Sequence, residues 1–325
     1  MKKLNLTLLL VLISMGFIAQ TTEAEKELIK TEKELKKQSK DSLDGWKAGF
    51  GLAVNLTQTS LTNWAAGGDN SVSVNGTLNL YADHKKGNTT WENSLDLAYG
   101  ILQQGDAQIR KTDDKIDFTS KYGRKAVKNW YYAALINFKS QMTAGYNYPD
   151  DSTEISNFMA PAYILGAIGM DYKPNKNLTL FISPLTMKTT IVNDQNLANE
   201  GAYGVDPAEY DDMGNIRSIG KMIRSEYGGY LRGIFKKEIM KNVNFQNKIE
   251  LFSNYSEEPE HIDVNWEILI DMKVNKYISA TVSTQLIYDH DVDIAVDKNG
   301  DDIIDAYGPR VQFKEIIGVG LSYKF

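Results

Sequence analysis

The stretch VQFKEIIGVGLSYKF, residues 311–325, decides the fold of this chain. Its apolar residues share one face when it is read in steps of two: Val311, Phe313, Ile317, Val319, Leu321, Tyr323 and Phe325. The opposite face is small or polar: Gln312, Lys314, Gly318, Gly320, Ser322 and Lys324. A period of two is that of a β-strand. At about 3.3 Å per residue and a tilt of roughly 40°, such a strand is long enough to cross the hydrocarbon core of a bilayer. We therefore expect a membrane strand with lipid on one side and polar surroundings on the other.

The end of this stretch resembles the terminal strand by which bacterial outer-membrane β-barrels are recognised for assembly. The resemblance rests on Tyr323 and on Phe325 as the last residue. It implies that these two aromatic residues form an assembly signal, and that the barrel-assembly machinery is a partner during biogenesis.

Two segments precede the strands. Residues 1–20 combine a basic start with an apolar run from Leu4 to Ile18, which is too short to span a membrane as a helix and is typical of a secretory signal peptide. Residues 21–45 are rich in Glu and Lys placed three or four apart. We expect a charged periplasmic helix or linker there, with a plug or partner-binding helix as the alternative.

Residues 46–325 repeat the alternation of the last strand. The pattern predicts twelve strands, at about 46–58, 71–84, 91–101, 115–122, 130–144, 163–172, 178–192, 227–238, 243–251, 262–274, 277–288 and 311–325. Short connections alternate with long ones, as in an all-β, antiparallel, up-and-down transmembrane barrel of the cell outer membrane with both termini in the periplasm. A soluble β-sandwich is the rival interpretation, but sandwich strands are shorter and their loops need not alternate in length.

Composition narrows the possible partners and cofactors. The chain has no cysteine, which excludes a lipid-anchored lipoprotein, a disulfide framework and a thiolate metal site. Its formal net charge is −6. We expect contacts with outer-membrane lipid and lipopolysaccharide, no nucleic-acid partner and no resident cofactor.

Several short motifs resemble one family. They are NWAAGG at 63–68, LDLAYG at 95–100, RKTDDK at 110–115, YNYP at 146–149 and SPLT at 183–186. In order, they are similar to a Bacteroidota outer-membrane family that carries only a domain-of-unknown-function label, over nearly everything after the charged segment. The resemblance implies a fold and a location. It implies no activity, catalytic residue or binding residue.

The inward positions of the predicted strands carry charges of both signs. The residues expected to line the lumen are Glu92, Asp96, Lys115, Asp117, Lys121, Lys139, Arg232, Lys248, Glu250, Glu267 and Asp271. Twelve strands give a backbone diameter of about 24 Å and leave a bore of roughly 10 to 14 Å after side chains. Two functions fit this lumen: a narrow channel for small polar solutes, or a structural or assembly component whose polar core is closed by salt bridges.

One acidic loop has the spacing of a calcium loop. Asp297, Asn299 and Asp301 match positions 1, 3 and 5, and Asp305 matches position 9. Asp302 stands where Gly is usual, and Gly308 stands where the bidentate Glu is needed. Calcium in an extracellular loop and a merely solvated acidic loop both remain open.

Catalysis is the third class of function. His261 and His290 fall at the tops of neighbouring hairpins beside Asp263, Asp289 and Asp291. No serine nucleophile motif accompanies them, and exposed loop histidines are ordinarily solvated residues. We therefore expect no enzyme, with an outer-membrane hydrolase as the less favoured alternative.

Overall fold

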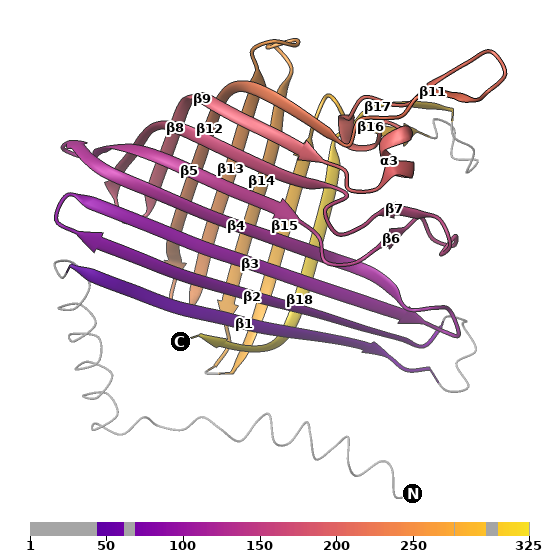
Figure 1. Cartoon of the computed structure of the whole chain (residues 1–325). Helices are drawn as coiled ribbons and strands as arrows, with labels where there is room; N and C mark the ends of the chain where they lie inside the picture. Colours follow the sequence, from indigo (N-terminus) through magenta and orange to yellow (C-terminus); the bar gives the residue numbers. More distant parts are fainter. Residues whose placement is uncertain (1–43, 62–68, 276, 297–304, 325) are drawn as a thin grey trace, which may run out of the picture. The chain divides into compact units, whose positions relative to one another are not determined.

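The computed structural model describes residues 44–61, 69–275, 277–296 and 305–324. The predicted signal peptide, residues 21–43 of the charged segment, the whole NWAAGG motif and Phe325 lie outside the described residues. Twelve long antiparallel strands form a closed barrel (Figure 1). This confirms the predicted fold class in its strand number and topology.

The barrel strands run up and down in chain order. Their bounds are β1 Gly45–Thr59, β2 Ser71–Lys86, β3 Thr89–Gln104, β4 Arg110–Val127, β5 Trp130–Ser140, β8 Ala162–Asn175, β9 Leu178–Ile191, β12 Ile223–Met240, β13 Val243–Asn254, β14 Ile262–Lys273, β15 Ile278–Tyr288 and β18 Gln312–Lys324. Around the wall the order is β1-β18-β15-β14-β13-β12-β9-β8-β5-β4-β3-β2. Each strand therefore pairs with its predecessor and successor among the long strands, and β18 closes on β1.

The outer face of the wall is apolar. Large apolar side chains are exposed along every part of it, among them Leu52, Leu80, Phe118, Ile136, Ile168, Ile182, Trp266, Phe313, Ile317, Val319 and Leu321. Exposed apolar surface on this scale requires an apolar surrounding, which lipid supplies. Within the described ranges, no helix is long and apolar enough to cross a membrane.

β4 begins earlier than the sequence predicts. We expected a loop through residue 114, but β4 pairs with β3 back to Arg110. The register shifts where Gly100 pairs with Asp113 and Ile101 with Lys111, so Thr112 is an extra residue on β4. A bulge of this kind breaks the alternation locally, which hid the start of the strand.

Pro184 in β9 lies at a second bulge, because proline cannot donate to the hydrogen-bond ladder. The register with β12 shifts between Gly228 and Tyr230, beside Pro184. Ser183 Oγ lies 2.8 Å from the Leu185 carbonyl oxygen, and the Thr186 hydroxyl donates to Ser183 Oγ at 2.8 Å. Proline has no amide to donate, so these hydroxyls supply the local hydrogen bonds that the ladder lacks.

The long loop 192–222 folds over the end of the barrel. It contains the helix α3, Gln195–Asn199, the 3-10 turn η1, Ala202–Gly204, and the pair β10, Glu209–Tyr210, with β11, Ile216–Ser218. Val192, Leu197, Ala198 and Val205 of this loop form a small core with Ala160, which precedes β8. η1 contacts β16, Asp293–Val296, which pairs with β17, Ala306–Pro309. The remaining short pair, β6 Gly145–Tyr146 with β7 Glu154–Ser156, lies in the neighbouring loop (Figure 1).

Tyr203 anchors this loop, whereas Tyr210 and Met213 do not, although the sequence alone suggests all three as anchors. The Tyr203 hydroxyl donates to the Ile155 carbonyl at 2.6 Å, and burial raises the pKa of Tyr203 to about 12. Tyr210 is 55% exposed and Met213 89% exposed, so neither holds the loop down. Both residues lie on or beside the outlying β10–β11 hairpin.

The closing seam depends on glycine. β1 pairs with β18 from Gly51 with Lys324 to Asn55 with Gly320. A Cβ on Gly320 would lie 2.1 Å from the Val54 carbonyl oxygen and 2.6 Å from Asn55 Oδ1. The backbones can approach this closely only because residue 320 has no side chain.

We therefore expect Gly320→Ala to reduce the folded fraction, measured as the heat-modifiable band on unboiled gels. The matched control is Gly166→Ala in β8, where nothing lies within 4 Å of the added Cβ. Equal folded fractions for the two variants would contradict a seam closed by contact at Gly320.

Candidate functional site within the lumen

Alternation along the strands turns charged side chains into the barrel. β4 contributes Lys115, Asp117 and Lys121, which are two or four residues apart. The neighbouring Phe118 and Tyr122 face outward and are exposed. Asp117 is 2% exposed and Lys121 9% exposed. The pattern that makes the outer surface apolar therefore also concentrates charge inside.

One ion pair joins opposite walls of the barrel. Lys115 Nζ in β4 lies 2.8 Å from Glu267 Oε2 in β14. In the ring of strands, five strands separate β4 from β14 in either direction. Lysine and glutamate side chains reach about 6 Å and 5 Å from Cα, so the two Cα atoms are at most about 14 Å apart. The walls are thus much closer here than the roughly 24 Å expected of a circular twelve-stranded barrel.

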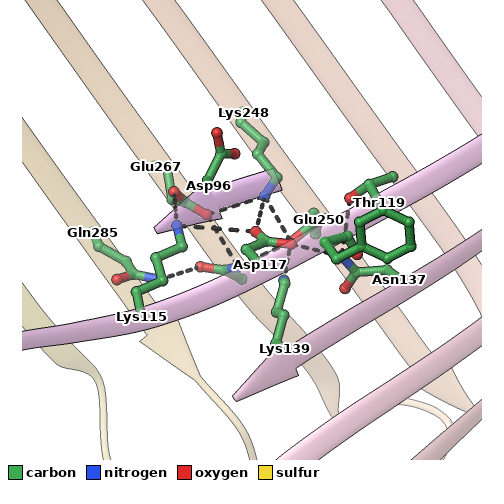
Figure 2. A network of polar contacts seen from close by, with 12 residues as sticks. Asp96, Lys115, Asp117, Thr119, Asn137, Lys139, Lys248, Glu250, Glu267 and Gln285 are labelled. Atoms are coloured by element: carbon green, nitrogen blue, oxygen red, sulfur yellow. Dashed lines mark hydrogen bonds and ion pairs between the residues drawn. The ribbon is translucent and has the colours of Figure 1, made fainter. Parts of the chain in front are cut away.

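Two further pairs cross the lumen next to this one (Figure 2). Lys248 Nζ in β13 lies 3.1 Å from Asp117 Oδ2 in β4 and 3.2 Å from Glu267 Oε1. Lys139 Nζ in β5 lies 2.5 Å from Glu250 Oε2 in β13. These groups, with Lys115, form a continuous set of alternating charges that we call the luminal network.

Neutral and cationic groups occupy the remaining positions around the luminal network. Asn137 Nδ2 donates to Asp117 Oδ1 at 2.6 Å, and the Tyr230 hydroxyl donates to Glu250 Oε1 at 2.8 Å. Arg232 Nε lies 3.4 Å from the same Glu250 oxygen. Buried carboxylates with several partners are much less costly than isolated ones, since each partner replaces lost hydration.

A second cluster lies nearer the tight turns. Lys121 Nζ is 2.8 Å from Asp171 Oδ2 and 3.2 Å from Glu92 Oε2, and Lys173 pairs with the same two acids. Asp171 is not among the residues predicted to line the lumen. Lys173 falls where a turn was expected, but β8 continues to Asn175. Asp171 stands opposite Tyr131 and Phe181, so the signal that could have found it was its inward register with β5 and β9.

Apolar side chains fill another part of the lumen. Leu135 and Phe181 are each 1% exposed, and they pack with Ala133, Ala167, Tyr230 and Phe252. These residues belong to β5, β8, β9, β12 and β13, the side of the ring on which Lys139 and Glu250 pair. This sector of the barrel is therefore a packed core.

A polar cavity of about 1050 Å³ remains on the other side. Eight of the eleven residues predicted to line the lumen line this cavity: Glu92, Asp96, Lys115, Lys121, Arg232, Lys248, Glu267 and Asp271. Its wall also includes Asp83, Asn177 and Lys236 near the tight turns. Near the long loops, Lys314 Nζ of β18 lies 2.8 Å from Asp113 Oδ1 of β4. This ion pair crosses the cavity. The predicted residues that do not line it, Asp117, Lys139 and Glu250, lie in the luminal network.

The predicted calcium loop is largely outside the described residues. Asp297, Asn299 and Asp301 fall there, and so do the residues between them. Asp305 is described, and its amide donates to the Val296 carbonyl oxygen at 2.9 Å, beside the β16–β17 pair. The side chain of Tyr323 and all of Phe325 are also outside the description, so the assembly signal stays a prediction.

Comparison with known proteins adds a family match over part of the chain. Residues 56–146 match the family described as Protein of unknown function (DUF3078). LDLAYG and RKTDDK lie inside this segment, whereas SPLT lies beyond it, so the match is shorter than the resemblance implied. No curated protein matches the chain.

Solved structures of low similarity include outer-membrane barrels. An outer-membrane channel from Pseudomonas putida F1 is 11% identical with a TM-score of 0.39, over 88% of this chain and 97% of that chain. The NanC porin is 8% identical with a TM-score of 0.37, over 85% and 100%. The translocator domain of the autotransporter NalP from Neisseria meningitidis is 11% identical with a TM-score of 0.32, over 93% and 96%.

The luminal network predicts a large stability cost when one charge is removed. Lys248→Met would leave Asp117, Glu250 and Glu267 with one cation fewer in a buried site. We expect the free energy of unfolding in detergent micelles, measured by urea titration, to fall by about 3–5 kcal/mol.

The matched control is Lys221→Met. Lys221 also pairs with an acid, Asp206, but the two side chains are 70% and 61% exposed on the long loop. Exposed pairs contribute about 0–1 kcal/mol, so this variant should unfold almost as wild type does. Similar losses in both variants would contradict a structural role for the luminal network.

Proposed function

We propose that this protein is an outer-membrane β-barrel that is closed at rest and acts as a structural or assembly component of an outer-membrane complex. The observation that carries the proposal is the Lys115–Glu267 bridge between opposite strands, reinforced by Lys248 and Lys139. An open pore keeps charged side chains solvated along its wall. Here the charges of one wall neutralise those of the other, which closes the path between them.

The location is supported by the two faces of the wall. An apolar exterior and a charged interior suit a barrel in lipid, and the apolar leader at residues 4–18 suits export. Tight turns rich in lysine and longer acidic loops suit an orientation with the turns and both termini in the periplasm. Lipid and lipopolysaccharide outside, and the barrel-assembly machinery during biogenesis, are the proposed partners.

A narrow channel for small polar solutes is the second candidate. The cavity of about 1050 Å³ favours it, because the cavity extends from Asp83 near the tight turns to Lys314 near the long loops. The Lys314–Asp113 pair would then be the constriction that must open. The lining mixes acids, lysines and neutral amides, which suits polar solutes of either charge.

Planar-bilayer conductance separates the two candidates. We expect the purified wild-type barrel to insert without stable conductance steps. Replacing the bridge on both sides, in Lys115→Ser with Glu267→Ser, removes the charges together and leaves neither partner unpaired. This double variant is expected to conduct, because the bridge between the opposite strands β4 and β14 is gone.

The control is the double variant Lys221→Ser with Asp206→Ser. It removes the same types of charge from an exposed loop pair and should stay silent. Stable ohmic conductance of the wild-type protein would overturn the closed barrel and favour the channel. Silence of the luminal double variant in correctly folded barrels would show that the bridge is not what closes the lumen.

A further inference from the structure

Two of the chain's three histidines come together at the long-loop end of the barrel. Glu258 and His261 lie in the connection between β13 and β14, and His290 follows β15. β14 and β15 are paired neighbours, with Val264 opposite Tyr288. The two connections therefore begin side by side, and this register brings residues distant in sequence into one cluster.

The donor atoms of these side chains converge. Glu258 Oε2 lies 2.9 Å from His261 Nδ1 and 3.4 Å from His290 Nε2. The two imidazole rings stack with centroids 3.7 Å apart and planes inclined by 27°. The three ligand atoms all lie within 4.8 Å of one another. A tetrahedral zinc ion with bonds of about 2.1 Å separates its donors by roughly 3.4 Å, so an ion could enter with small side-chain shifts.

Local structure holds the cluster in place. The His261 amide donates to the Glu258 carbonyl oxygen at 2.8 Å, so a tight turn places both side chains on one side. The Tyr288 hydroxyl lies 3.1 Å from His290 Nδ1. A hydrogen bond at Nδ1 orients the ring and directs the other nitrogen, Nε2, toward Glu258, as outer partners do in metal sites.

The surroundings favour a cation. A cavity of about 490 Å³ adjoins the cluster and is also lined by the acids Glu226, Glu257, Asp263 and Asp291. The basic groups nearby are already paired with acids: Arg224 with Glu257 and Asp291, and Lys188 with Asp263, Asp289 and Glu226. Acids outnumber bases here, which raises the local concentration of cations.

We propose that Glu258, His261 and His290 form a binding site for a divalent transition-metal ion of the zinc type at the long-loop end of the barrel. Imidazole nitrogen with one carboxylate oxygen suits Zn²⁺, Cu²⁺ or Ni²⁺, whereas Ca²⁺ and Mg²⁺ take oxygen ligands. Three protein ligands leave a coordination position for water or for a ligand from outside. The site uses none of the residues of the predicted calcium loop and does not depend on whether the lumen conducts.

The test is titration calorimetry of the full-length barrel in detergent with ZnCl₂, after removal of any affinity tag and treatment with a chelator. We expect one zinc ion per chain. His261→Gln and His290→Gln should each raise the dissociation constant at least tenfold. The heat-modifiable band on unboiled gels checks that both variants are folded.

The matched control is His84→Gln. His84 is the remaining histidine; it lies in β2, where its ring is 4.9 Å from that of Trp46. This variant should bind zinc as wild type does, and CaCl₂ should not compete with zinc. The proposal is overturned if wild type binds no zinc, if binding survives both loop substitutions, or if His84→Gln weakens it equally.

Discussion

The structure depends on neutralising charge inside a wall whose outside is apolar. A strictly alternating strand can expose Phe118 to lipid only if Asp117 and Thr119 point into the barrel. Lone charges in that interior would be expensive, so each must find an opposite charge within reach. Lys115 and Glu267 do so across the barrel, which requires that opposite walls approach each other. The closed lumen that we propose would be a consequence of this pairing.

The shape of the wall follows from features that break its regularity. The bulge at Pro184 shifts the alternation of β9, so that Phe181 and Thr186 both become buried despite their odd spacing. Phe181 then joins the apolar cluster with Leu135, and Thr186 bonds to Ser183. Gly320 allows β18 to approach β1. Bends and close contacts of this kind let a twelve-stranded barrel depart from a circular section.

Sequence predicted the fold well because lipid imposes a period of two along each strand. The same parity identified Lys115, Asp117 and Glu250 as inward residues, but it could not pair them. Pairing depends on which strands stand opposite each other and on how far the wall is flattened, and neither is encoded locally. Asp171 has the inward parity and was overlooked in its strand, whereas its pairing with Lys121 could be seen only in the fold. The expected bore of 10 to 14 Å assumed a circular section. The Glu258–His261–His290 cluster likewise needed the register of β14 with β15.

The most direct test of the account is the distance between opposite walls, measured by pulsed electron paramagnetic resonance. Spin labels attached at Ile116→Cys in β4 and Ile268→Cys in β14 would sit outside the wall beside Lys115 and Glu267, and the natural chain has no cysteine to interfere. Walls joined by the bridge predict a label separation roughly 10 Å shorter than that of a circular twelve-stranded barrel. A distribution centred on the circular value would contradict the closed lumen.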